Sequence, residues 1–146
     1  LISQQAAVQA EPGYAIGFGA ASTLLAVAVN VLQGELAASK GDYRLAVGHL
    51  DKAVRLEDTL LYNEPPDWYF PVRHVLGAVL LEAGNAAEAE VVYWEDLRRN
   101  PDNGYALFGL SQALAAQGDV ATKKEIDRRF ALAWQYADVK LTSSRY

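Results

Sequence analysis

Residues 76–101 read LGAVLLEAGNAAEAEVVYWEDLRRNP, and this stretch predicts two antiparallel helices joined by a tight turn. Gly84 follows an apolar run and can adopt the left-handed conformation that ends a helix. Asn85 comes next and can accept hydrogen bonds from the free N–H groups of a second helix, with Glu88 placed three residues later as in a capping box. The succession of helix, glycine, cap and helix is typical of a helical hairpin.

The same arrangement occurs three times along the chain, which indicates an internal repeat. Small residues form pairs seven positions apart, namely Gly34 with Gly41, Gly77 with Gly84, and Ser111 with Gly118. A capping residue directly follows the second member of each pair: Asp42, Asn85 and Asp119. Ala46 and Leu50 in the first unit correspond to Ala89 and Tyr93 in the second. Because Gly77 and Ala89 carry little or no side chain, we expect their helices to cross closely.

These signals predict helices and no strand, with the chain divided into three parts. The expected helices span about residues 22–40, 43–57, 68–83, 86–99, 103–117 and 120–137. Residues 1–21 form an N-terminal segment that can be read as the remnant of a preceding repeat, and 22–137 hold three repeats with an insertion near 58–70. Residues 138–146 form a tail that is expected to pack over the last helix, the alternative being a frayed end.

The repeated positions resemble those of the tetratricopeptide-repeat family, whose pattern runs from a small residue through glycine and alanine to a large apolar residue and a closing proline. The second unit matches best, with Leu76, Gly77, Gly84, Ala89, Tyr93 and Pro101 in frame. The resemblance covers about residues 27–135 and implies an all-α, right-handed superhelix of about three helical hairpins. The chain also resembles the C-terminal part of bacterial multi-repeat proteins of undefined role.

Four residues depart from the family pattern, and the third unit also lacks the closing proline. Asn30 and Gln33 replace large apolar residues in the first unit, and Asp96 replaces the late alanine of the second. Lys123 stands where the third unit should have an alanine. Since a terminal repeat needs a polar outer face, residues 122–127 read as a solvated cap, with a charged binding patch as the alternative.

The resemblance implies that the first helix of each hairpin lines a concave groove that holds a peptide or a partner helix. By register, the groove residues are Val31, Glu35, His74, Ala78, Glu82, Tyr105, Phe108 and Gln112. The set lacks the lysines and asparagines with which the family grips a terminal carboxylate. We therefore expect a different mode of binding.

The insertion DTLLYNEPPDWYF at residues 58–70 has two interpretations. Its apolar residues, among them Leu60, Leu61, Tyr62 and Trp68, can pack over an enlarged joint between repeats, or its aromatics can form a binding surface. A sharper hypothesis places the insertion over the groove. The side chains of Tyr62, Glu64, Trp68, Arg73 and His74 then meet Glu35 in a small polar pocket.

Composition limits the function further. A net charge of -5 argues against nucleic-acid binding, and the lack of cysteine excludes disulfides and thiolate chemistry. Residues 12–34 carry no charge, but their glycine and polar content favours a buried helix over a membrane span. Neither Ser111 nor Gly17 lies in a catalytic or nucleotide-binding motif, and no cofactor or metal is predicted.

The leading prediction is a non-catalytic scaffold that binds a protein or peptide in its groove. The alternative is a sensor of a small ligand or peptide, with its pocket covered by the insertion. An enzyme is a third reading, which requires an acid–base pair such as Glu35 and His74. The partner, the oligomeric state and a cytoplasmic or periplasmic location are left open by the sequence.

Overall fold

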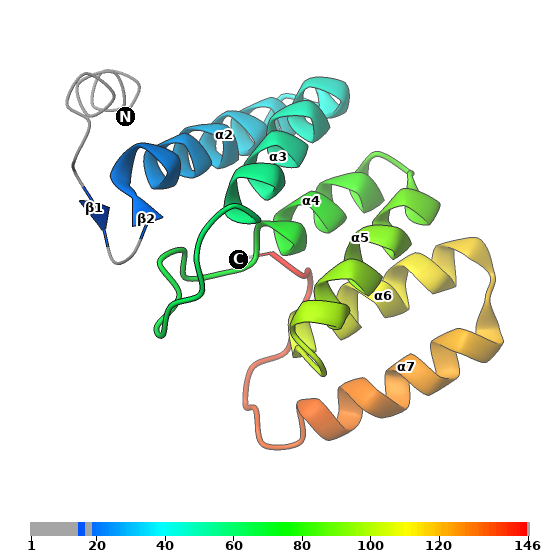
Figure 1. Cartoon of the computed structure of the whole chain (residues 1–146). Helices are drawn as coiled ribbons and strands as arrows, with labels where there is room; N and C mark the ends of the chain where they lie inside the picture. The colour runs from blue at the N-terminus through cyan, green and yellow to red at the C-terminus, as the bar shows by residue number, and fades with distance from the viewer. Residues whose placement is uncertain (1–14, 17–18, 146) are drawn as a thin grey trace. The chain divides into compact units, whose positions relative to one another are not determined.

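The computed structural model describes residues 15–16 and 19–145, and the chain divides into two compact units, Leu1–Val72 and Arg73–Tyr146. The described part is all-α, as predicted, and its six helices are α2 (Ala21–Ser39), α3 (Tyr43–Glu57), α4 (Val72–Glu82), α5 (Ala86–Arg99), α6 (Gly104–Gln117) and α7 (Val120–Ala133) (Figure 1). The two-residue strands β1 (Ala15–Ile16) and β2 (Gly19–Ala20) pair antiparallel and were not predicted. The rest of segment 1–21, apart from Ala21, lies outside the described residues.

Two helix boundaries differ from the sequence prediction by more than one residue. Helix α4 begins at Val72 instead of residue 68, because Pro71 precedes it and the Glu57 carboxylate accepts the Val72 N–H at 3.0 and 3.3 Å. Helix α7 ends at Ala133 instead of residue 137, and the N–H of Trp134 donates to the Phe130 carbonyl at 2.9 Å. The insertion therefore spans residues 58–71.

The three predicted glycine turns share one geometry. Gly41, Gly84 and Gly118 have φ angles of 77°, 80° and 77°, in the left-handed region. In each turn the next residue donates its N–H to the carbonyl five positions earlier: Asp42 to Ala37, Asn85 to Leu80, and Asp119 to Leu114, at 3.0, 2.8 and 3.0 Å. This six-to-one bond defines the Schellman motif, so one local device closes the first helix of every hairpin.

The predicted caps are confirmed at two of three positions. Asp42 accepts the N–H of Leu45 at 3.1 Å, and Asp119 accepts that of Thr122 at 3.0 Å. Asn85 makes no side-chain cap bond, so the capping box predicted there is wrong. Backbone bonding alone ends one helix and starts the next at this turn.

The same two repeat positions meet in every hairpin. A methyl group at Gly34 would lie 2.6 Å from Leu50 Cγ, and one at Gly77 would lie 2.4 Å from Tyr93 Cζ. The equivalent Ser111 instead donates a hydrogen bond to Asp127 at 2.5 Å. The three atoms nearest to a methyl group at Gly77 all belong to Tyr93, while at Gly34 the third is the carbonyl oxygen of Ala46, 3.3 Å away.

Polar contacts replace apolar packing at this position in the third hairpin. Lys123 lies 2.6 Å from Asp127, so the lysine that departs from the repeat pattern pairs one helical turn along α7. Burial raises the pKa of Asp127, but hydrogen bonds from Lys123 and Ser111 outweigh it and lower the pKa overall. The opposite charges of the Lys123 and Asp127 side chains therefore compensate each other within α7.

Helix α2 is the apolar helix of the first unit and packs along α3. Its 19 residues and mean hydropathy of 1.4 are enough by length and composition to cross a membrane, although core helices of soluble proteins pass the same test. In the chain, 44% of the apolar window is buried. The absence of a membrane span stays a prediction.

Candidate functional site: a groove along helices α4 and α6

Three of the predicted groove residues line one cavity of about 280 Å³ in the second unit. Ala78 and Glu82 stand one turn apart on α4, and Gln112 faces them from α6. The other described residues of the lining are Leu81, Thr142 and Ser143. Two first helices of successive hairpins thus share this cavity with the C-terminal tail.

The tail, residues 138–145, is anchored mainly toward its end, and it packs there against α4 and α5 and not over the last helix as predicted; Val139 is 57% exposed. Ser144 is only 1% exposed, and its Oγ donates to the His74 carbonyl at 2.9 Å and lies 2.6 Å from the Tyr93 hydroxyl. Arg145 reaches Glu82 at 2.6 Å. The Trp134 indole N–H donates to the Val139 carbonyl at 2.7 Å, which fixes the turn from α7 into the tail.

The Tyr93 hydroxyl contributes a polar group to this site. The Tyr93 ring extends between α4 and α6, where a methyl group at Gly77 or Gly109 would lie 2.4 or 2.2 Å from its Cζ. Two missing side chains therefore let a residue of α5 reach Ser144. Burial raises the pKa of Tyr93, so the hydroxyl keeps its proton and can donate it in a hydrogen bond.

The side chain of His74 is turned into the protein and does not line the partner-binding groove, contrary to the sequence prediction. It is 1% exposed, and its Nε2 lies 3.1 Å from Asp96 Oδ2. Asn100 donates to the other Asp96 oxygen at 3.1 Å, and the Tyr105 ring stacks on the imidazole with centroids 5.8 Å apart. Asp96, which departs from the repeat pattern, gives the imidazole a partner inside the hairpin, and the hydrogen bond between His74 and the tail is made by the His74 carbonyl.

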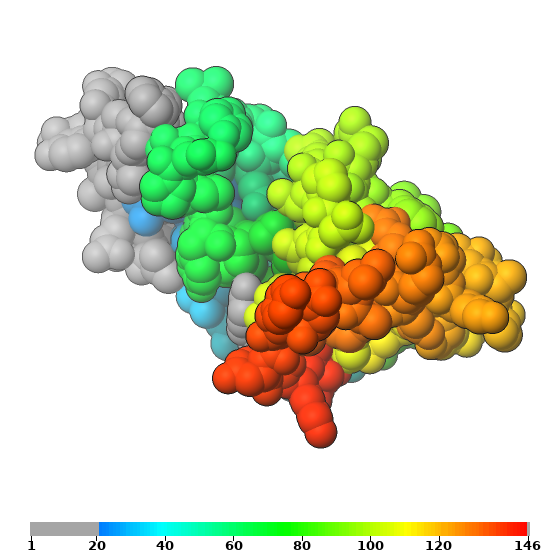
Figure 2. Space-filling view, turned by 90° about the horizontal axis from the view of Figure 1, so that it is seen from below, coloured from blue at the N-terminus to red at the C-terminus, as the bar shows by residue number. Residues whose placement is uncertain are grey.

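The two aromatic groove candidates pack toward α7. The ring of Tyr105 meets Trp134 edge-on at 5.3 Å, and that of Phe108 lies 5.7 Å from Phe130. Both residues are half-buried. Figure 2 shows α7, in orange, against the yellow surface of α6. Tyr105 and Phe108 therefore help to hold the last hairpin together.

Val31 and Glu35, the groove candidates of the first unit, are half-buried on α2. Because they belong to the other compact unit, a groove continuous over all three hairpins stays a prediction.

The insertion is largely exposed, which contradicts the packed interpretation for Leu61 and Tyr62, 64% and 82% exposed. The Tyr62 hydroxyl donates to Glu64, and this bond raises the pKa of Tyr62. Trp68 is half-buried, with its ring 5.5 Å from Phe70. The indole N–H of Trp68 and Oδ2 of Asp67 are buried without a hydrogen-bond partner in the described part of the chain.

The predicted polar pocket draws on both units. Tyr62, Glu64, Trp68 and Glu35 lie in the first unit, whereas Arg73, itself 7% exposed, and His74 lie in the second. Contact among these side chains in one pocket stays a prediction. His74 is the exception, because its imidazole already contacts Asp96.

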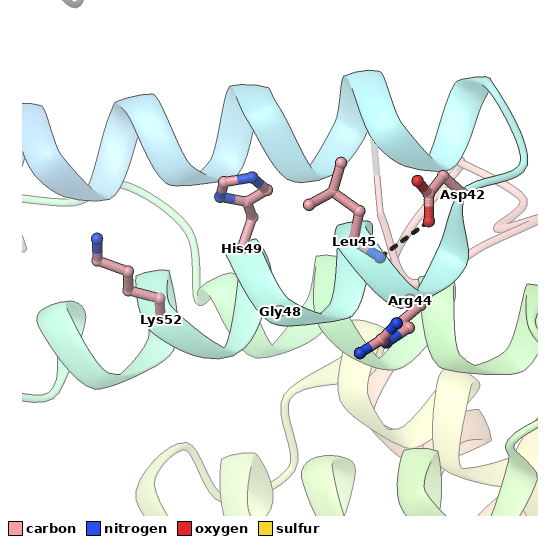
Figure 3. Close-up of a pocket in the computed structure, with 6 residues that line it drawn as sticks. All are labelled: Asp42, Arg44, Leu45, Gly48, His49 and Lys52. Carbon is pink, nitrogen blue, oxygen red and sulfur yellow. Dashed lines mark hydrogen bonds between the residues drawn. The ribbon is translucent and has the colours of Figure 1, made fainter.

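A second cavity, of about 500 Å³, lies along α3 (Figure 3). Its described lining comes from α3 and its cap: Asp42, Arg44, Leu45, Gly48, His49 and Lys52. Arg44 points away from His49 and Lys52 in Figure 3, and His49 Nδ1 lies 3.3 Å from Asn30 Oδ1. The polar groups do not converge on one point. Over the residues that the structure describes, no group of three His, Cys, Asp or Glu could hold a metal ion.

Neither a family model nor a curated protein matches this sequence. The contacts along α4 and α6 are therefore the basis for assigning a role to the chain.

Proposed function

We propose that the chain is a tetratricopeptide-like scaffold that binds a protein or peptide segment and catalyses no reaction. In this proposal the three hairpins stack into a right-handed superhelix. Support comes from the shared Schellman turns and from the contact that recurs sixteen residues apart in each hairpin, at Gly34 with Leu50, Gly77 with Tyr93, and Ser111 with Asp127.

One observation carries the proposal. A segment of chain without helix or strand, the tail, already lines one cavity together with Ala78, Glu82 and Gln112 and bonds to His74 and Glu82 of α4. Those three residues were selected from repeat register as groove residues. A surface that accommodates one irregular segment through backbone, hydroxyl and charge contacts has the chemistry to accommodate another.

The non-catalytic reading is supported by the position of the His74–Asp96 pair. Both side chains are 1% exposed, so a substrate has no path to the imidazole in this structure. General acid–base catalysis requires hydrogen-bond reach to the reacting atom. We therefore assign the pair to stability.

The test uses two variants of the full chain in affinity capture followed by mass spectrometry. Gln112→Trp fills the groove cavity with an indole and is expected to lose the captured partner. Val91→Trp introduces the same indole at a residue of α5 that is 68% exposed, and it is expected to retain the partner. Equal capture by both variants would contradict the proposal.

The alternative, a sensor with a pocket at the insertion, is favoured by the unpartnered atoms of Trp68 and Asp67. Trp68→Phe keeps an aromatic ring but removes the N–H group. The groove proposal expects this variant to bind the partner like the wild type. If Trp68→Phe abolishes binding and Gln112→Trp leaves it unchanged, the sensor reading replaces the groove.

A further inference from the structure

Resting on the proposed binding function, we propose that the groove recognises a non-helical segment in which a small hydroxyl residue precedes a basic residue. The chain's own tail lines the groove cavity with Thr142 and Ser143 and competes with the partner through Ser144, which bonds to His74 and Tyr93, and Arg145, which pairs with Glu82. The tail thus has the sequence features that the ligand needs, and it also acts as an inhibitor within the same chain.

The hydroxyl requirement follows from hydrogen-bond directions at Ser144. A serine hydroxyl has one proton, which it donates to the His74 carbonyl at 2.9 Å. Its oxygen is then free to accept the proton of Tyr93, 2.6 Å away. Alanine in this position would leave the buried Tyr93 hydroxyl without its partner. A larger side chain has little room, because Ser144 is 1% exposed.

The preference for a basic residue follows from Glu82. Its carboxylate lies 2.6 Å from the Arg145 guanidinium, and the two side chains are 38% and 21% exposed. An acidic residue at this point would place two like charges side by side. Glu82 thus selects the sign of the charge that follows the hydroxyl.

The tail can leave its site without dismantling a helix. It has no secondary structure, and Asp138, Val139, Lys140 and Thr142 are exposed. Among the contacts that hold it are the bonds of Ser144, the Arg145 ion pair and the Trp134 bond to Val139. A site occupied by its own tail binds a partner more weakly, in proportion to the fraction of time that the tail is away.

The first experiment measures the tail without any ligand. Hydrogen exchange of residues 141–145 is followed by mass spectrometry in the full chain. Ser144→Ala and Arg145→Glu are each expected to accelerate exchange by about tenfold, because they remove anchors of a locally opening segment. Arg145→Glu combined with Glu82→Arg restores the ion pair and is expected to restore protection. Arg98→Glu, the same charge change on α5, is the control and should leave the tail protected.

The second experiment measures recognition. The probe is a blocked, fluorescent peptide with the sequence of residues 138–145, DVKLTSSR. It is expected to bind the Arg145→Glu chain about tenfold more tightly than the wild type, because the internal competitor is weakened. Peptides ending in SSE or SAR, which change the basic or hydroxyl residue, are expected to bind about tenfold more weakly than DVKLTSSR.

Each failure has its own meaning. Unchanged exchange in both tail variants would overturn the competition but leave the scaffold proposal standing, and equal binding of the three peptides would overturn the stated ligand chemistry. Both proposals would be overturned if the peptide does not bind the Arg145→Glu chain and if Gln112→Trp and Val91→Trp capture the partner equally. If light scattering shows a dimer that Arg145→Glu dissociates, the occupant is the tail of a second copy, and a foreign ligand is ruled out.

Discussion

Gly77→Ala is expected to lower the free energy of unfolding by about 2–3 kcal/mol, at the upper end of the usual cost of overpacking a core. Alanine is ordinarily the better helix former by about 1 kcal/mol, so the expected loss runs against intrinsic propensity. The cause is the Tyr93 ring, whose Cζ, Cε1 and hydroxyl oxygen would lie 2.4, 2.6 and 2.7 Å from the new methyl group. Urea unfolding followed by circular dichroism measures the change.

The same substitution is expected to become neutral or stabilising in a Tyr93→Ala background. Alanine lacks the ring atoms that clash with Gly77, whereas leucine would not relieve the clash, because a methyl group at the equivalent Gly34 would lie 2.6 Å from Leu50 Cγ. The new methyl group then fills part of the vacated space and regains its helix preference. A double-mutant cycle gives the interaction between the two sites directly.

Gly48→Ala is the matched control for this cycle. Gly48 also lies inside a helix, α3, but a methyl group there would meet no atom within 4 Å. Gly48→Ala is therefore expected to stabilise the chain by up to about 1 kcal/mol, as propensity alone predicts. If Gly77→Ala stabilises the wild-type chain to the same degree, Tyr93 does not occupy the position described here.

Local sequence signals were sufficient to predict the hairpin turns and several helix boundaries of this chain. Glycine followed by a polar residue located every hairpin turn, because the left-handed conformation and the following six-to-one bond depend on a few adjacent residues. The boundaries of α3 and α5 were predicted as observed. The start of α4 was missed because its cap comes from Glu57, fifteen residues away, and such a contact has no local pattern.

The candidate site was predictable only in part. Repeat register identified Ala78, Glu82 and Gln112, since residues at equivalent helix positions face the same way. Register could not show that Ser144, fifty-one residues from Tyr93, bonds to its hydroxyl. Nor could it show that His74 turns inward, although a charged residue at the alanine position of Asp96 was a signal that a buried partner was needed.

Asp96→Ala is expected to lower the free energy of unfolding by about 3 kcal/mol, within the range for breaking a buried polar pair. A carboxylate can only accept hydrogen bonds, so the proton between the pair is carried by His74 Nε2. Removing Asp96 leaves that N–H buried, and it also removes the acceptor of the Asn100 side chain. The His74 Nδ1 atom already lacks a partner in the described part of the chain, so the imidazole has no substitute nearby.

Two further variants separate the lost hydrogen bonds from the lost packing. Asp96→Asn keeps the shape but offers one acceptor to two donors, and it is expected to cost about half as much as alanine, near 1–2 kcal/mol. His74→Leu with Asp96→Leu removes both polar groups and is expected to cost less than Asp96→Ala alone, because apolar replacement of both partners avoids an unsatisfied group. Urea unfolding at neutral pH provides the comparison. A double variant that is less stable than Asp96→Ala would show that packing, and not the buried pair, holds α4 to α5.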